Sequence, residues 1–178
     1  MDPPSGFKHS TKTVLIIGLA LVQIAHSWVN DWDQPADFEC LSKEAISRIE
    51  SIHSNAKEDR RWKFECQDVK VVNNDCYTTE YINAYHELIA FECDYQKAIV
   101  GIDSIHHNGN KDRQFKIKCC KVPSFSYQSC YITGYINAFD GVMDKAIGSK
   151  EVFAGLYSFY NGGKGDRRWK VKICTIKG

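Results

Sequence analysis

The sequence predicts an all-β domain built as a pseudo-threefold repeat, because one motif occurs three times at a nearly constant spacing. The motif Asp-Arg-x-(Trp/Phe) occupies residues 59–62, 112–115 and 166–169, with spacings of 53 and 54 residues. Apolar and polar residues alternate after each copy, which is the pattern of a half-buried strand. A repeat of this length is typical of closed arrays of β units. We expect a β-prism of three sheets around one core, with a β-trefoil as the alternative.

The strand that follows each motif has one apolar face and one basic face. The apolar face carries Trp62, Phe64 and Cys66 in the first copy, Phe115, Ile117 and Cys119 in the second, and Trp169, Val171 and Ile173 in the third. A helix would scatter these residues around its axis. We therefore expect Trp62, Phe115 and Trp169 to meet in a common core.

A turn and a connector accompany each motif. Residues 54–58, 107–111 and 161–165 hold Asn, Gly and Lys just before the motif, so the motif strand is expected to be the second strand of a hairpin. The connector Cys76–Ala84 is repeated as Cys130–Ala138 and is rich in Tyr, Ile and Thr, as strands are. Each unit should hold three to four strands, although residues 82–90 also fit a helical turn.

The first 27 residues resemble a secretory signal peptide. Lys8 and Lys12 precede an apolar run over residues 14–22, and residues 25–27 are small enough around His26 for cleavage. The run is shorter than the roughly 20 residues of a spanning helix, and a signal anchor is the alternative. We expect a single domain over residues 28–178. That part carries 21 basic and 21 acidic side chains, which argues against general nucleic-acid binding.

The eight cysteines all lie after the predicted signal peptide, where export favours disulfides. The repeat predicts two pairs that are 26 residues apart, Cys40–Cys66 and Cys93–Cys119, and two that are 44 apart, Cys76–Cys120 and Cys130–Cys174. The third copy has Ile147 and Ile173 in place of the first kind of pair, so both members are absent together. Pairing Cys66 with Cys76 and Cys120 with Cys130 is the alternative, but it leaves four cysteines in unequal roles.

The chain offers little for catalysis. It has no C-x-x-C or H-x-x-x-H spacing for a metal, no G-x-S-x-G and no phosphate-binding loop. His53 and His106 are repeat-equivalent strand residues, for which a structural role is expected. We expect no enzymatic activity, no cofactor and no metal.

The Asp-Arg pairs of the motif allow two interpretations. These pairs are Asp59-Arg60, Asp112-Arg113 and Asp166-Arg167. They could form three equivalent ligand sites, as in multivalent lectins. Alternatively, each Asp binds backbone N–H groups at the turn while each Arg pairs with a neighbouring strand. The adjacent core aromatic residue favours this second, structural interpretation.

The basic faces of the three motif strands are candidate glycan-binding surfaces. They carry Arg61 and Lys63, then Lys116 and Lys118, then Arg168, Lys170 and Lys172. Rows of cations bind sulfated glycans or anionic cell surfaces, whereas a solvated face that discourages edge pairing is the alternative. The connector tyrosines Tyr77, Tyr81, Tyr85, Tyr131 and Tyr135 either stack on sugars or pack between strands.

The triple motif, the leader and the cysteine pattern with its Cys119-Cys120 doublet resemble the dermatopontin family, which includes haemagglutinin/amoebocyte aggregation factors and a hydrozoan cytotoxin. The resemblance covers the whole predicted mature chain. The chain departs from vertebrate dermatopontin in lacking one further cysteine pair and in Arg61, Gln114 and Arg168 at the variable motif position. The resemblance implies a small secreted matrix or cell-adhesion protein without catalytic residues.

These observations predict a secreted, non-catalytic adhesion protein of the extracellular space or matrix. The expected partners are matrix proteins, cell-surface receptors or sulfated glycans, without nucleic acid and without a transmembrane span. An agglutinating, lectin-like defence protein or a membrane-active cytotoxin is the alternative function.

Overall fold

The computed structural model describes residues 27–123 and 125–177, and within them every regular element is a β-strand. The predicted signal peptide lies almost entirely outside the described residues. The strands are β1 (Ala36–Glu39), β2 (Glu44–Ser54), β3 (Asp59–Asp68), β4 (Val72–Thr78), β5 (Ile89–Glu92), β6 (Lys97–His107), β7 (Asp112–Lys121), β8 (Phe125–Ile132), β9 (Met143–Ala146), β10 (Glu151–Asn161) and β11 (Asp166–Ile176). The all-β prediction is confirmed, and the described part of the chain contains no helix suited to crossing a membrane.

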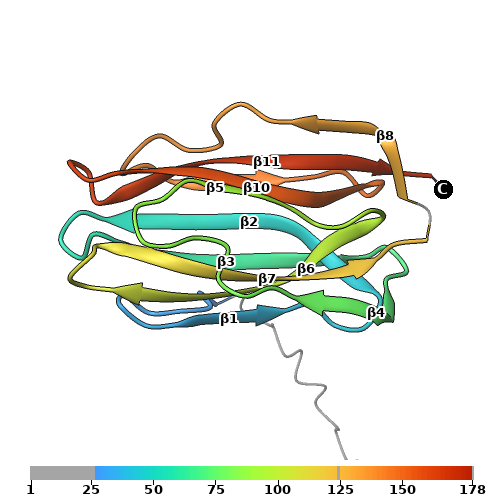
Figure 1. Ribbon diagram of the computed structural model, residues 1–178, viewed down its shortest axis with the longest axis horizontal. Coiled ribbons are helices and arrows are strands. Elements are labelled where there is room, and N and C mark those ends of the chain that lie inside the picture. Colours follow the sequence, from blue (N-terminus) through green and yellow to red (C-terminus); the bar gives the residue numbers. More distant parts are fainter. Residues whose placement is uncertain (1–26, 124, 178) are drawn as a thin grey trace, which may run out of the picture.

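Three long hairpins, β2–β3, β6–β7 and β10–β11, form the centre of three sheets, and their strands run along the long axis of the molecule (Figure 1). The first sheet has the order β3-β2-β9, the second β1-β6-β7-β4, and the third β5-β10-β11-β8. All strand pairs are antiparallel. The arrangement is compatible with the predicted β-prism.

The sheets are built by exchange between the repeats. Each short strand precedes one hairpin in the sequence but pairs with the next one: β1 with β6, β5 with β10, and β9 with β2. The exchange returns to the first hairpin and so closes a ring. The expected combination of a hairpin with a connector strand is present in two of the sheets, where β4 and β8 pair with the hairpin that follows them in the sequence. No helical turn forms over residues 82–88, and Ile89 begins β5.

The core lies between the three sheets and follows the predicted alternation. Trp62, Phe115 and Trp169 are buried, and their rings contact one another edge to face with centroids 5.1–5.9 Å apart and interplanar angles of 83–87°. This geometry is favourable for aromatic rings because the edge of one ring meets the electron-rich face of the next. One equivalent residue from each repeat thus fills the centre.

The structure contains four disulfides, which join the pairs that the repeat predicts. Cys40–Cys66 and Cys93–Cys119 connect the end of an exchanged short strand to a hairpin of another sheet. Cys76–Cys120 and Cys130–Cys174 join directly opposed residues of adjacent strands. The buried Cys120 and Cys174 lie in a second apolar cluster with residues such as Val100 and Val152.

Candidate ligand-binding site

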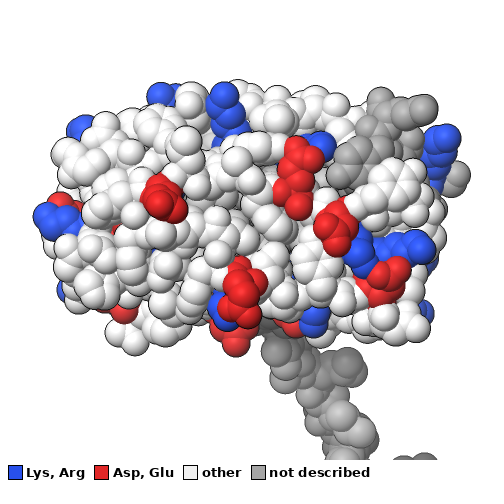
Figure 2. Space-filling view, in the orientation of Figure 1, with Lys and Arg blue, Asp and Glu red and all other residues white. Residues whose placement is uncertain are grey.

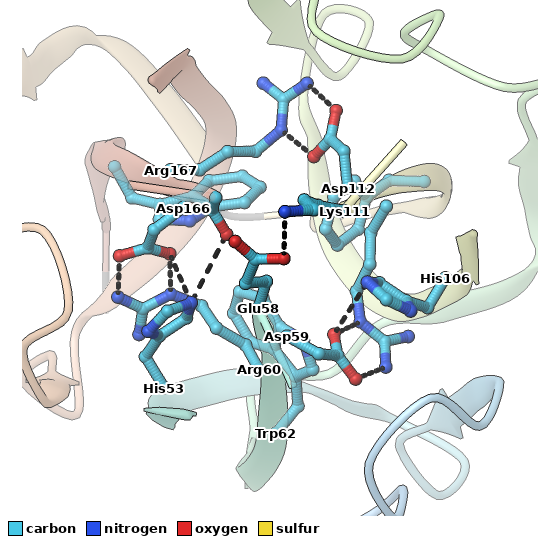
Figure 3. A pocket seen from close by; sticks show the side chains of 14 residues that line it. His53, Glu58, Asp59, Arg60, Trp62, His106, Lys111, Asp112, Asp166 and Arg167 are labelled. Atoms are coloured by element: carbon cyan, nitrogen blue, oxygen red, sulfur yellow. Dashed lines mark hydrogen bonds and ion pairs between the residues drawn. The ribbon is translucent and has the colours of Figure 1, made fainter. Parts of the chain in front are cut away.

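The motif Asp and Arg side chains form a closed ring at the hairpin-turn end of the core (Figure 3). Each guanidinium binds both oxygens of a carboxylate from another repeat: Arg113 binds Asp59 at 2.6 and 2.8 Å, Arg167 binds Asp112 at 2.7 and 2.7 Å, and Arg60 binds Asp166 at 2.6 and 2.7 Å. No side chain in the ring is more than 4% exposed. The Arg of each motif therefore reaches a neighbouring repeat, as in the structural interpretation.

The ring leaves no room for a ligand. The cavity that it lines has a volume of about 20 Å³, which is enough for a single water. The hairpin turns cover it, since Lys111 and Glu58 form an ion pair at 2.6 Å and Gly165 lies against Glu58. A Cβ at Gly165, whose φ is +56°, would come within 2.9 Å of the Glu58 Cβ. A ligand would therefore have to bind on the outer faces of the sheets.

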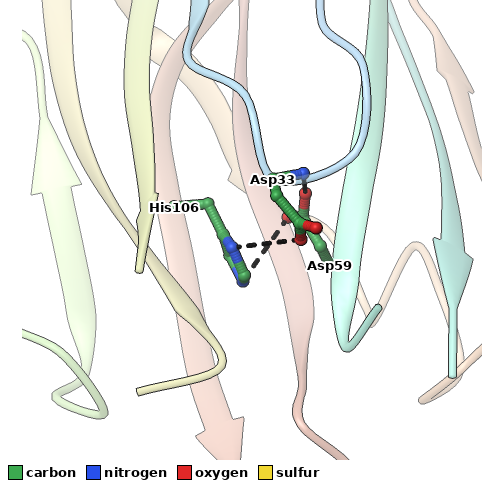
Figure 4. A group of neighbouring side chains, drawn as sticks. All are labelled: Asp33, Asp59 and His106. Carbon is green, nitrogen blue, oxygen red and sulfur yellow. Dashed lines mark hydrogen bonds and ion pairs between the residues drawn. The ribbon is translucent and has the colours of Figure 1, made fainter. Parts of the chain in front are cut away.

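Two groups of His and Asp side chains adjoin the ring. The His106 ring, which is 1% exposed, has Nδ1 3.6 Å from Asp33 Oδ1 and Nε2 3.9 Å from Asp59 Oδ1 (Figure 4). His53 lies in the equivalent position beside Asp140 and Asp166. Lys57 binds Asp33 at 3.1 Å and Arg113 binds both oxygens of Asp59, so cations already neutralise these carboxylates. This charge balance disfavours a metal ion there.

A buried Asn in each repeat holds a loop against the motif strand. The Asn83 amide donates to the Arg113 carbonyl at 2.9 Å, and its Oδ1 accepts from the Phe115 N–H at 3.1 Å. Asn30 and Asn137 make the equivalent two bonds in the other repeats. Apolar–polar alternation does not single out these residues, although Asn30, Asn83 and Asn137 are spaced by 53 and 54 residues like the motif.

Each buried Asn is flanked two residues away on both sides by an aromatic residue, and we call the resulting surfaces aromatic platforms. The first platform consists of Trp28, Trp32 and Arg61, the second of Tyr81, Tyr85 and Gln114, and the third of Tyr135, Phe139 and Arg168. In each one the variable motif residue donates to the carbonyl of the platform's Asn. In the third, the guanidinium carbon of Arg168 lies 3.8 Å from the Tyr135 ring centroid.

Most cations of the predicted basic rows are neutralised by acidic neighbours. Ion pairs join Lys63 to Glu50 at 2.7 Å, Lys118 to Glu39 at 2.7 Å, Lys172 to Glu92 at 2.5 Å, Lys116 to Glu80 at 3.4 Å and Arg61 to Asp31 at 3.6 Å. The rows also lie on three different sheets and form no continuous band. The face shown in Figure 2 is mostly uncharged, with charged side chains standing singly or in small mixed groups.

The third sheet departs from this pattern. The residue opposite the middle Lys is Glu50 for Lys63 in the first sheet and Asp103 for Lys116 in the second. In the third sheet the residue opposite Lys170 is Tyr157. Among the described residues, no carboxylate lies within ion-pairing distance of Lys170 or Arg168.

A groove adjoins these two cations. It has a volume of about 330 Å³ and is lined by Leu88, Ile89, Ala90, Ile132, Tyr135, Tyr157, Ser158, Phe159 and Lys170. Tyr135 is 44% exposed, and the Lys170 ammonium lies 4.6 Å from its ring centroid. The groove thus combines exposed aromatic and apolar surface with positive charge. This third-sheet groove is the strongest candidate for a ligand site.

Comparison with known proteins finds relatives that match most of the chain. It is 38% identical over 170 residues to hemagglutinin/amebocyte aggregation factor of Limulus polyphemus, a match that covers 94% of this chain and 98% of the relative. It is 32% identical over 148 residues to dermatopontin of Biomphalaria glabrata, covering 83% of this chain and 99% of the relative. Millepora cytotoxin-1 of Millepora dichotoma is 31% identical over 148 residues, which covers 83% of this chain and 66% of the cytotoxin.

The matches extend through all three repeats. No solved structure gives a significant match. The sequence profile of the dermatopontin family matches residues 30–178, which include every motif copy and every cysteine. The chain therefore belongs to the dermatopontin family.

Proposed function

We propose that this protein is a secreted, non-catalytic adhesion protein that binds anionic glycans in the third-sheet groove. Export would follow cleavage of a signal peptide over residues 1–27, leaving one domain over residues 28–178. Four disulfides suit an oxidising extracellular environment. Matrix proteins and cell-surface receptors that carry sulfated glycans are the expected partners.

The observation that carries the proposal is the replacement of a carboxylate by Tyr157 opposite Lys170. Lys170 therefore has no opposed carboxylate, beside a groove of about 330 Å³. Arg168 also lacks an ion-pair partner among the described residues, because Ala138 stands where Asp31 pairs with Arg61 in the first repeat. A sulfated sugar offers negative oxygens for the two cations and C–H groups for the Tyr135 and Phe159 rings. Pockets that combine apolar walls with a few placed polar groups are typical ligand sites.

The names of the relatives agree with adhesion as the general role. One of them is named hemagglutinin/amebocyte aggregation factor, and another is named dermatopontin. Agglutination requires binding to cell surfaces, and an anionic glycan is a widespread ligand on such surfaces. The proposal assigns this binding to one face of the molecule.

Heparin affinity chromatography with a matched pair of variants tests the proposal. Arg168→Gln with Lys170→Gln should weaken heparin binding about tenfold, since two exposed charge contacts contribute roughly 0.5–1 kcal/mol each. The repeat-equivalent change, Arg61→Gln with Lys63→Gln, should have little effect because Asp31 and Glu50 already pair with those cations. Wild-type retention should also fall steeply with salt, because screening weakens exposed charge contacts.

Equal retention of the two double variants would contradict the assignment to the third-sheet groove. The relative named as a cytotoxin supplies the competing outcome. Exposed Leu88 and Ile132 beside the groove cations also fit an anionic membrane surface. Dye release from phosphatidylserine-containing vesicles, lost in the Arg168→Gln/Lys170→Gln variant and not inhibited by heparin oligosaccharides, would favour membrane activity.

A further inference from the structure

The three aromatic platforms share one backbone frame. In every copy a buried Asn fixes the loop, and the aromatic residues on either side of it are retained as Trp and Trp, Tyr and Tyr, or Tyr and Phe. The bond that anchors the loop is also repeated, because the N–H groups of Val29, Ile82 and Ile136 donate to the carbonyls of Trp62, Phe115 and Trp169 at 2.7–2.9 Å. The first and second platforms therefore place different side chains at the positions equivalent to those of the third platform.

The first platform carries two tryptophan rings. Trp28 and Trp32 are both half-buried, and the Arg61 guanidinium carbon lies 5.6 and 5.7 Å from their ring centroids. Asp31, at 3.6 Å, offsets the charge of Arg61. This platform is therefore aromatic with no uncompensated charge.

The second platform is also charge-balanced. Tyr81 is 41% exposed, with the Lys116 ammonium 4.8 Å from its ring centroid. Glu80 pairs with Lys116 at 3.4 Å, and the variable motif position holds the uncharged Gln114. A stacking surface without net charge suits an uncharged ligand with an apolar C–H face.

We propose that the first and second platforms bind neutral pyranose rings by stacking, so that one chain carries three saccharide sites of two kinds. The inference rests on the proposed function, which supplies the third, anionic site. A pyranose offers C–H groups on its face for an aromatic ring and hydroxyls at its rim for polar neighbours such as Arg61 and Gln114. Aromatic rings with one wet face and one polar neighbour are suited to such amphipathic ligands.

The platforms belong to three different sheets arranged around one core. Because Arg61, Gln114 and Arg168 all lie on strand faces opposite the buried aromatic residues, the platforms face away from the centre in different directions. A single chain can therefore hold two surfaces together without forming an oligomer. Joining weak sites on one body increases overall binding by about 10²–10⁴ when they engage together.

A glycan array that carries both neutral and sulfated glycans tests the inference on protein confirmed as a monomer by light scattering. The Arg168→Gln/Lys170→Gln variant should lose sulfated glycans and keep neutral ones. Adding Trp28→Ala and Tyr81→Ala should reduce neutral binding at least tenfold. Tyr95→Ala, at an exposed aromatic residue outside the platforms, is the matched control and should leave both signals unchanged.

A second readout reports directly on the first platform. Trp28 and Trp32 belong to it, whereas Trp62 and Trp169 are buried in the core. Titrating the neutral glycans that bind on the array should shift tryptophan emission, and Trp28→Ala should remove most of that shift. Circular dichroism verifies that each variant is folded.

The two proposals fail in different ways. An array without neutral binding, or neutral binding that survives Trp28→Ala with Tyr81→Ala, overturns the two stacking sites. Sulfated-glycan binding that survives Arg168→Gln with Lys170→Gln contradicts only the groove proposal. Binding of neutral glycans that is found only for a dimeric fraction of the protein would overturn the claim that one chain suffices.

Discussion

The Asp-Arg ring buries six charged side chains, and its geometry explains why this burial is tolerated. Each carboxylate accepts two bonds from a guanidinium and one from a loop N–H; Asp166, for example, accepts from Arg60 and from the Asp140 N–H at 2.8 Å. Bidentate charge-assisted bonds of this kind are among the strongest in proteins. The desolvation cost of buried ions is offset only when every partner is present.

Removing one member of the ring should therefore be severe. Arg60→Met leaves Asp166 buried and unpaired, and we expect a loss of about 3–5 kcal/mol of unfolding free energy. Combining it with Asp166→Asn removes both charges and keeps an acceptor for the Asp140 N–H, so the double variant should be more stable than Arg60→Met alone. Urea denaturation of the wild type, both single variants and the double variant measures this coupling. Additive effects would show that the pair is not coupled.

A carboxylate pair on the second sheet should make stability depend on pH in the opposite sense to an ordinary ion pair. Asp37 and Asp103 are directly opposed, and burial together with the Asp37 carboxyl raises the pKa of Asp103 above its usual 3.8. Their repulsion is absent when Asp103 is protonated and reduces stability as pH rises through its folded pKa. Asp37→Asn should thus stabilise the protein near pH 7 by about 0.2–1 kcal/mol, and much less near pH 3.

Asp144 provides the control with the opposite sign. Its hydrogen bonds to Arg48 hold the pKa of the carboxyl below its usual value, so its contribution is present above the unfolded pKa and is lost as pH falls through the folded one. Asp144→Asn should therefore reduce stability near pH 7 and matter little near pH 3. Denaturation curves at the two pH values distinguish the variants. The same pH response in both would contradict the assignment of the shifts.

Residue-level prediction from the sequence was good where alternation or spacing carried the signal. The burial of Trp62 and the pairing of Cys40 with Cys66 both follow from it. The neutralisation of Lys118 could not be predicted, because Glu39 reaches it only through strand exchange. The role of Asn30 could not be predicted, because it depends on hydrogen bonds to a strand 30 residues away.

At the scale of the elements, the two kinds of disulfide have different roles. The pairs separated by 44 residues fix the edge strands β4 and β8 to their neighbours. The pairs separated by 26 residues link one sheet to another. The third inter-sheet position holds Ile147 and Ile173 instead, and both pack in the main core.

The repeat predicts that a fifth disulfide can be introduced at this position. In the other copies the corresponding Cα atoms are 5.9 and 5.8 Å apart, and the Ile147 N–H makes the same bond, to the Ser47 carbonyl, as its equivalents make. Ile147→Cys with Ile173→Cys should form the bond and stabilise the protein by up to about 3 kcal/mol for this loop length. Non-reducing mass spectrometry and melting with and without reductant measure the outcome. Two free thiols in folded protein would contradict the repeat equivalence.

At the scale of the whole molecule, strand exchange makes each repeat depend on the other two. The hairpin β2–β3 receives β9 from the last repeat, and its Arg60 binds Asp166 there. The central aromatic contact needs one ring from each repeat. The described chain should consequently unfold in one cooperative transition.

Cutting the chain between β7 and β8 tests this dependence without breaking any disulfide. A fragment over residues 28–121 keeps three of the four bonds, and one over 122–178 keeps Cys130–Cys174. The larger fragment lacks β8, β9, β10 and β11, so we expect no cooperative urea transition in its tryptophan fluorescence. Adding the smaller fragment should restore the transition. A cooperative transition in the larger fragment alone would show that two repeats suffice.

The overall architecture was predictable from the sequence only in part. The repeat and the alternation predict three hairpins and a shared core, and both are present. They do not specify that β1, β5 and β9 pair with the following hairpin, because the pairing of a four-residue strand depends on where the chain can reach. The groove depends on this exchange, since Leu88, Ile89 and Ala90 come from β5 and the loop before it.

The exchange of short strands also restricts how such a protein can evolve. Its sequence consists of three copies, and deleting the third would remove both the hairpin β10–β11 that receives β5 and the strand β9 that completes the first sheet. Open solenoids lengthen by one unit at a time because each unit contacts only its neighbours. Here β9 of the last repeat pairs with β2 of the first, so the strand exchange closes a ring. A fourth copy would have to open this ring of strand pairs, whereas a second entire domain joined in tandem would leave it intact.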